Sequence, residues 1–168
     1  DGTISSYGVS GGYLTMTKEE DYVLVKGDFV MNSRYSMNGK LSAGTLEVRG
    51  DFSQLASGNY NFSATGNHLT KLSGNQGQSV SFAGSNVYSH FAKLEVRNTS
   101  ASGVELKSDI RVITSLDDSN SKVNKKYKTI ISNFGVLTSD CFGGNLYVER
   151  ESSLDKDVTV LGTLTQRQ

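Results

Sequence analysis

One segment of alternating inward and outward residues recurs four times in this chain, 23 or 24 residues apart. Each copy carries two inward positions separated by a single residue, which is the two-residue period of a β-strand. These inward pairs are Val23 and Val25, Leu46 and Val48, Thr70 and Leu72, and Leu94 and Val96. A repeat of this length indicates one supersecondary unit stacked on copies of itself.

A turn residue follows each copy at the same place. The four turn residues are Gly27, Gly50, Gly74 and Asn98. These residue types adopt a left-handed backbone at the lowest cost, so we expect a corner with positive φ in every copy. A strand followed by a recurrent corner predicts a coil, in which each strand lies parallel to its equivalent in the next coil. Val48, Leu72 and Val96 should then be vertical neighbours.

Apolar columns with a spacing of 24 residues continue through the second half of the chain. They are Ile110, Phe134 and Val158, then Val112, Val136 and Val160, and finally Phe82, Leu106, Ile130 and Leu154. Side chains at one phase of successive coils would share a core, where each contributes about 1.5–3 kcal/mol on burial. With 168 residues, this period predicts an all-β solenoid of about seven coils of 23–24 residues.

The sequence divides into one repeat domain with irregular ends. Residues 1–21 have few apolar positions, and we interpret them as an irregular first coil or a cap on the exposed solenoid end. Residues 22–164 form the repeat domain. The polar segment 117–126 is predicted to be a loop that leaves one corner, and 165–168 a tail.

Charge and composition exclude several classes of partner. The 17 basic and 17 acidic residues cancel, which removes the positive surface typical of nucleic-acid-binding proteins. No segment approaches the ~18 apolar residues of a membrane span, so no membrane insertion is expected. The lone Cys141 cannot form an internal disulfide, and we interpret it as a buried thiol rather than a nucleophile.

The outward positions of the repeated strand carry charges of both signs. They read Leu24, Glu47, Lys71 and Glu95 in one column, and Lys26, Arg49, Ser73 and Arg97 in the next. Opposite charges on neighbouring strands are typical of a solvated sheet face. A polysaccharide lyase or hydrolase would need clustered acids, and the sequence puts no two acids together in these columns. We therefore expect no catalytic residues.

No metal or cofactor is expected either. Asp28, Asp51 and Asn75 each follow a turn residue, where Asx side chains commonly bond the turn backbone. A calcium site would need a denser ligand motif than one residue per coil. His68 and His90 lack the neighbouring Cys or His residues that a metal site requires.

Carbohydrate binding is the most specific ligand hypothesis, because exposed aromatic rings stack on sugar faces. Tyr147 occupies an outward position by analogy with Glu95, so the candidate carbohydrate-binding residues are Tyr147, Glu47, Lys71 and Glu95.

Three segments carry a family resemblance. Gly44–Phe52, Gln78–Phe82 and Leu94–Asn98, with their Val, Leu and Phe columns, resemble repeats of the right-handed parallel β-helix. That architecture occurs in pectate lyases and in repeat regions of large bacterial surface and secreted proteins. The resemblance implies a right-handed winding and a bacterial extracellular or cell-surface location.

Two functions fit these expectations. The first is a non-catalytic structural or adhesive module, a rigid stalk or presentation domain within a larger chain that carries other domains. The alternative is a carbohydrate-binding module attached to a polysaccharide-acting enzyme. In either case the expected partner is a glycan or another cell-surface ligand.

Overall fold

The structure is a computed structural model that describes continuous segments of the N-terminal two-thirds and short strands beyond them. The described residues are 4–5, 12–33, 35–55, 61–83, 88–118, 123–124, 129–131, 136–137, 141–142, 146–149, 153–154, 159–160 and 163–167. All regular secondary structure in these residues is β-strand. None of them forms a helix long and apolar enough to cross a membrane.

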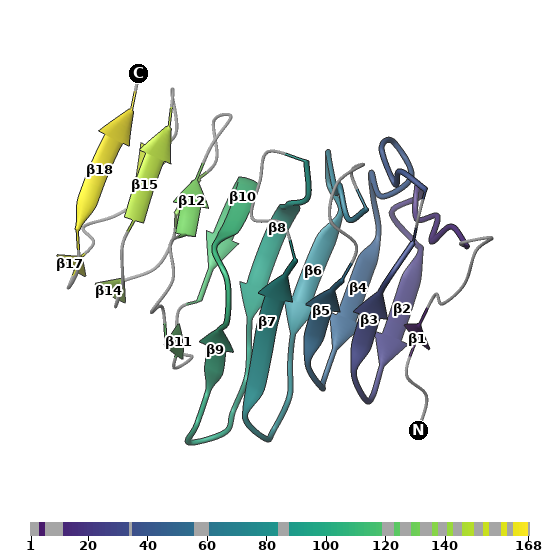
Figure 1. The fold of residues 1–168 in the computed structure, drawn as a ribbon, viewed down its shortest axis with the longest axis horizontal. Helices are drawn as coiled ribbons and strands as arrows, with labels where there is room; N and C mark the ends of the chain where they lie inside the picture. The colour runs from purple at the N-terminus through teal and green to yellow at the C-terminus, as the bar shows by residue number, and fades with distance from the viewer. Residues whose placement is uncertain are drawn as a thin grey trace.

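Two parallel sheets run side by side along the molecule (Figure 1). The larger sheet contains β2 (Tyr22–Val25), β4 (Thr45–Val48), β6 (Leu69–Leu72), β8 (Phe91–Val96), β10 (Ile110–Asp117), β12 (Thr129–Ile131), β15 (Leu146–Glu149) and β18 (Leu164–Arg167), in that spatial order. The second contains β1 (Ile4–Ser5), β3 (Phe29–Met31), β5 (Phe52–Gln54), β7 (Gln78–Phe82), β9 (Val104–Leu106) and β11 (Val123–Asn124). The chain alternates between the sheets, as in a β-solenoid of about four turns.

Four short strands complete the described structure. β13 (Val136–Leu137) pairs with β10 and with β16 (Ser153–Leu154), and β14 (Cys141–Phe142) pairs with β17 (Thr159–Val160). These pairs are parallel as well, so the expectation of an all-β parallel solenoid is confirmed.

The register of the first four rungs is the one that the repeat predicts. Val25 pairs with Val48, Val48 with Leu72, and Leu72 with Val96. These four side chains are buried, with at most 2% of their surface exposed. The vertical stacking of Val48, Leu72 and Val96 is therefore confirmed.

An aromatic cluster fills the interior between the two sheets. Phe52 lies at its centre, with its ring centroid 5.0–5.5 Å from four other phenylalanine rings. Those rings belong to Phe29, Phe62, Phe82 and Phe91, each at most 5% exposed. Offset and edge-to-face pairs of this kind contribute beyond simple burial, so the cluster is the densest part of the core.

The predicted register of the C-terminal half is wrong. Ile110 pairs with Thr129, and Val112 with Ile131. Val136 lies beside Ser115, and Leu106 lies beside Val80 rather than beside Phe82. The turns differ in length there, and strand pairing rather than a constant spacing sets the register.

A β-bulge in β10 adds a copy of the repeat that the constant spacing had hidden. Val112 pairs with Phe91 and Ser115 with Lys93, so β10 contains one extra residue. The bulge places Leu116 beside Leu94 and Asp117 beside Glu95. A bulge of this type re-aims the residues that follow it. Asp117 therefore ends a strand, although the sequence placed it at the start of a loop.

The turn glycines are required for a different reason from the predicted one. Gly50 and Gly74 do not have positive φ, whereas Gly44, Gly66 and Gly103 do. A Cβ at Gly50 would overlap the backbone of Gly27 in the turn beside it. The recurrent glycine thus lets successive corners pack backbone against backbone, and the left-handed residues lie at other corners.

Candidate functional site

The outward face of the larger sheet brings together three of the four predicted carbohydrate-binding residues. Glu47 pairs with Lys71, and Lys71 with Glu95, on three adjacent strands. The alternation of charge along this column follows directly from the strand register. Lys71 therefore lies between two carboxylates.

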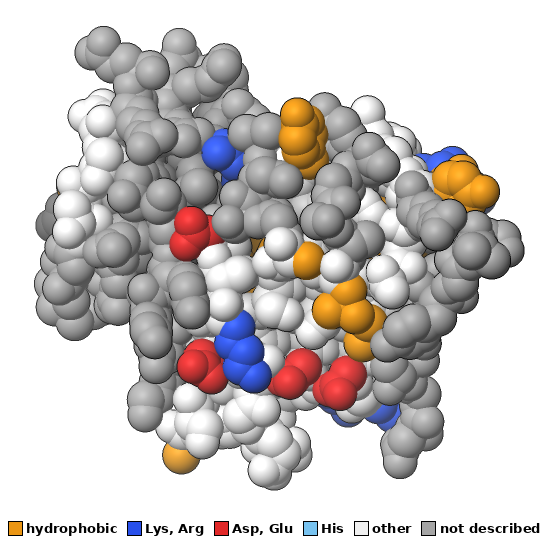
Figure 2. Space-filling view, in the orientation of Figure 1, with side chains coloured by type: hydrophobic (Ala, Val, Ile, Leu, Met, Phe, Trp, Pro, Cys, Tyr) orange, Lys and Arg blue, Asp and Glu red, His pale blue; other side chains and the backbone are white. Residues whose placement is uncertain are grey.

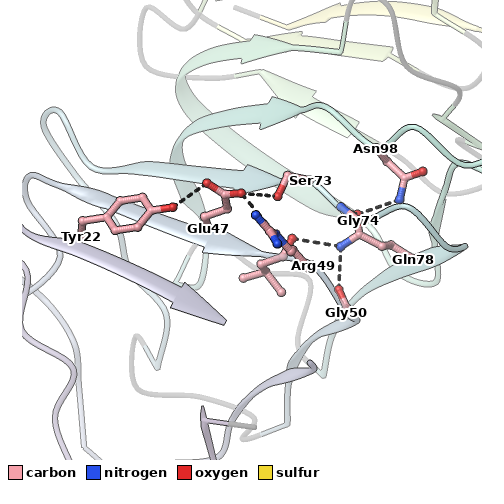
Figure 3. Close-up of polar contacts among 9 residues, drawn as sticks. Tyr22, Glu47, Arg49, Gly50, Ser73, Gly74, Gln78 and Asn98 are labelled. Atoms are coloured by element: carbon pink, nitrogen blue, oxygen red, sulfur yellow. Dashed lines mark hydrogen bonds and ion pairs between the residues drawn. The ribbon is translucent and has the colours of Figure 1, made fainter. Parts of the chain in front are cut away.

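Glu47 is the most enclosed member of this column, with 9% of its surface exposed. Its Oε2 accepts a hydrogen bond of 2.8 Å from the Tyr22 hydroxyl, and its Oε1 accepts one of 2.6 Å from the Ser73 hydroxyl (Figure 3). The Arg49 Nε lies 3.7 Å from Oε1. The carboxylate thus holds side chains from three adjacent turns together.

These contacts keep Glu47 ionised. Burial alone raises the pKa of its carboxyl group, but the hydrogen bonds from Ser73 and Tyr22 and the charges of Lys71 and Arg49 outweigh it. The net pKa lies below the ordinary value of 4.5. The same hydrogen bond to Glu47 raises the pKa of Tyr22. A carboxylate of this kind is a poor proton donor near neutral pH, because a general acid needs a raised pKa.

The expectation that no outward column places two acids together is wrong. Asp117 is the register partner of Glu95 on the neighbouring strand. Arg97 forms a hydrogen-bonded ion pair with Asp117 and lies 3.7 Å from Glu95. The hydrogen bond to Asp117 raises the pKa of the Arg97 guanidinium. The two acids therefore share one arginine, an arrangement that neutralises them.

A polar groove of about 600 Å³ runs along the corner between the two sheets. It is lined by Lys26, Asp28, Arg49, Gly50, Asp51, Ser73, Asn75, Gln76 and Gly77. Acidic and basic side chains gather in a row across the lower part of the face shown in Figure 2. The groove thus offers charges of both signs over one corner.

The aspartates of this corner form the predicted ladder. Asp28 Oδ1 accepts a hydrogen bond of 2.8 Å from the backbone N–H of Asp51. Asp51 Oδ1 accepts one of 2.7 Å from the backbone N–H of Ser79. Each bond joins one turn of the solenoid to the next, so these carboxylates stabilise the stack.

Gln78 forms the inner part of the same corner (Figure 3). Its Nε2 donates to the carbonyls of Val48 at 3.1 Å and Gly50 at 2.6 Å. Its Oε1 accepts from the Gly74 N–H and from Asn98 Nδ2, both at 2.8 Å. The side chain is 3% exposed, so one buried amide links three turns through four hydrogen bonds.

Replacing Gln78 with methionine should lower the free energy of unfolding by about 1–3 kcal/mol, because buried partners lose their hydrogen bonds while the volume is nearly retained. Urea unfolding of the variant and of the wild type measures this change. The matched control is Gln76→Met, at an exposed position in the same corner, which we expect to change stability little. Equal stability of the two variants would show that the Gln78 network is unimportant.

The two histidines lie inside the molecule. His68 precedes β6, is fully buried, and neither ring nitrogen has a hydrogen-bond partner. Burial lowers its pKa from 6.5 to about 4. His90 is 8% exposed, just before β8. In the described part of the chain, His, Cys, Asp and Glu side chains nowhere gather in groups of three or more that could hold a metal ion.

Tyr147 does not join the column of Glu95. It lies in β15, where it pairs with Ile130 of β12 and Thr165 of β18, whereas Glu95 pairs with Asp117. Its side chain lies outside the described residues. Its role in sugar binding stays a prediction.

A pair of tyrosines that the sequence did not bring together lies near the N-terminal end. The rings of Tyr13 and Tyr35 stack at 5.2 Å with an interplanar angle of 29°. They come from segments that precede β2 and follow β3. The sequence gives no signal for this pairing, because neither tyrosine belongs to a repeated position.

Two other residues could have been found. Gln78 has the same period-two phase as Val80 and Phe82, so its burial follows from the strand pattern. Ser115–Asp117 resembles Lys93–Glu95 in having leucine between two polar residues. Only the constant spacing had to be abandoned to see this copy.

Comparisons with known proteins give no match: no family model matches the chain, and neither a curated protein nor a solved structure is significantly similar to it.

Proposed function

We propose that this chain is a non-catalytic structural or adhesive module, a rigid stalk or presentation domain of a larger bacterial surface or secreted protein. Its mechanism would be geometric, because stacked turns hold other domains at a fixed distance from a surface. The proposal includes the finer description of the fold as a right-handed β-helix of about seven coils, related to the repeats of such proteins.

The observation that carries this proposal is that successive turns are joined at three levels. The backbones pair in parallel from β2 to β10. Inside, the column from Val25 to Val96 is continuous. At the corner, Asp28, Asp51 and Gln78 bond from one turn to the next. Bending the stack would break contacts at all three levels.

The surface charges support a non-catalytic role. Glu47 is engaged by Tyr22, Ser73 and Arg49, and Arg97 neutralises Glu95 and Asp117. Networks of this kind also occur purely as structural elements of a solvated sheet face. The carboxylates whose pKa is shifted are Asp21 and Glu47, and both shifts are downward.

Stiffness can be measured between two spin labels at the exposed positions Thr17 and Lys107, with Cys141 replaced by serine. We expect one narrow distance distribution by pulsed electron spin resonance, because four bonded turns separate the labels. The same labels in a Phe52→Ala background should give a broader distribution. A broad or multiple distribution in the wild type would contradict a rigid stalk.

Enzymatic activity is the outcome that would replace this proposal. A reducing-end assay on a panel of neutral and acidic polysaccharides should show no depolymerisation. Activity that is lost in Glu47→Gln or Lys71→Ala would instead assign a catalytic groove to the outward face of the large sheet.

The alternative function, a carbohydrate-binding module, is favoured by one observation. The stacked rings of Tyr13 and Tyr35 remain 55% and 43% exposed. Exposed aromatic rings are the groups that such modules use to hold sugars, and this pair is independent of the predicted residues Tyr147, Glu47, Lys71 and Glu95.

A further inference from the structure

We propose that Tyr13, Tyr35 and Lys40 form a binding platform for an acidic polysaccharide. The inference rests on the carbohydrate-binding alternative, to which it adds a site and a ligand class. It does not depend on the stalk proposal.

The tyrosine pair is unusual for its exposure. The phenylalanine rings of this protein lie in the core, whereas Tyr13 and Tyr35 stack on each other and still leave about half of their surface in water. Each ring presents an apolar body with a polar hydroxyl. The apolar C–H face of a sugar ring can cover such a surface while its hydroxyl groups stay in water.

The platform is held by the backbone around it. The N–H of Met16 donates to the Lys40 carbonyl at 2.7 Å, which fixes the segment of Tyr13 against that of Lys40. The Ser33 hydroxyl donates to the Gly12 carbonyl at 3.3 Å and accepts from the Tyr35 N–H at 3.1 Å. A pre-organised aromatic surface loses little conformational entropy when a ligand binds.

Lys40 gives the platform its charge preference. Its Nζ lies 4.6 Å from the centroid of the Tyr13 ring, a cation–π contact. An ammonium group has three N–H donors, so this contact leaves donors for another acceptor. A hexuronate residue supplies both parts of the complementary surface, an apolar ring face and a carboxylate.

Single-stranded nucleic acid also combines stacking rings with negative charge, but it fits this surface less well. Such sites use a positively charged groove that follows the phosphates, in addition to the aromatic rings. Here Lys40 is the cation in contact with the rings, and the chain as a whole has no net positive charge. An acidic glycan with stacked sugar rings is therefore the favoured ligand.

The test is affinity electrophoresis of the full chain in gels that contain alginate or carboxyl-reduced alginate. We expect the wild type to be retarded more by alginate. Tyr13→Ala and Tyr35→Ala should each weaken binding to both polymers roughly three- to tenfold, the effect of losing one aromatic contact. Lys40→Gln should remove the preference for alginate while keeping the weaker binding.

The control is Tyr88→Ala, which removes a tyrosine as exposed as Tyr35 from another part of the surface. It should bind like the wild type, and circular dichroism should show that all variants are folded. Retardation that no platform variant reduces would overturn this site while leaving the carbohydrate-binding alternative standing. Absence of binding to both polymers would overturn both. Stronger binding to oligothymidylate than to alginate would assign the platform to nucleic acid instead.

Discussion

Replacing Phe52 with alanine should lower the free energy of unfolding by about 3–5 kcal/mol, the largest effect expected of a single substitution in this chain. Phe52 is fully buried and touches phenylalanine rings on every side. It is also the register partner of Phe29 and Val80 in the two adjacent turns. The cavity would therefore weaken both interfaces of its turn. Chemical denaturation followed by circular dichroism measures the change.

The matched control is Leu55→Ala, three residues further along the chain. Leu55 is 46% exposed, so its truncation should change stability by no more than about 0.5 kcal/mol. In a solenoid, each turn contacts only its neighbours, and a weakened interface reduces cooperativity as well as stability. We therefore expect a broader transition for Phe52→Ala. A loss below about 1 kcal/mol would mean that the aromatic cluster can close around the cavity.

Acid should destabilise the protein through His68. In the unfolded chain its pKa is the ordinary 6.5, whereas burial lowers the pKa in the folded protein to about 4. Between these values the unfolded chain binds a proton that the folded chain does not, so stability is fully present above pH 6.5 and falls as the pH drops towards 4. The shift corresponds to a loss of about 3 kcal/mol.

His68→Leu isolates this contribution, because leucine has a similar volume and does not titrate. The variant should lose much less stability than the wild type between pH 6.5 and pH 4 when urea unfolding is repeated across this range. It should also be no less stable at pH 7, since it removes two buried nitrogen atoms that lack hydrogen-bond partners. Glu47 and Asp21, whose pKa values are lowered, remain in both proteins and cancel in the difference. Parallel pH profiles of the two proteins would contradict the assignment.

The candidate surfaces were only partly accessible to sequence analysis. The column of Glu47, Lys71 and Glu95 follows from strand register alone, and the structure has the same neighbours. The Tyr13–Tyr35 pair depends on how two irregular segments cross, for which no periodic pattern exists. Asp117 reached Glu95 through a bulge, a local event that a fixed spacing cannot express.

The sequence by itself determined the strands, their parallel stacking and the register of the first four rungs. The period of two residues places every second side chain inward, and nearly equal turn lengths keep the inward residues of successive copies in phase. From Val25 to Val96, this local pattern is sufficient because one face of each strand is buried, where a slip of one residue would expose it.

Only the tertiary structure decided what joins the turns. Gly50 is required because the backbone of the adjacent corner lies where a side chain would be, and not because of its own φ. Gln78 bonds to groups that are 20 or more residues away for three of its four contacts. In the C-terminal half, unequal turns let strand pairing choose a register that the 24-residue columns do not show. Contacts between turns depend on the path of the intervening chain, and a repeat in sequence specifies that path only where the turns are alike.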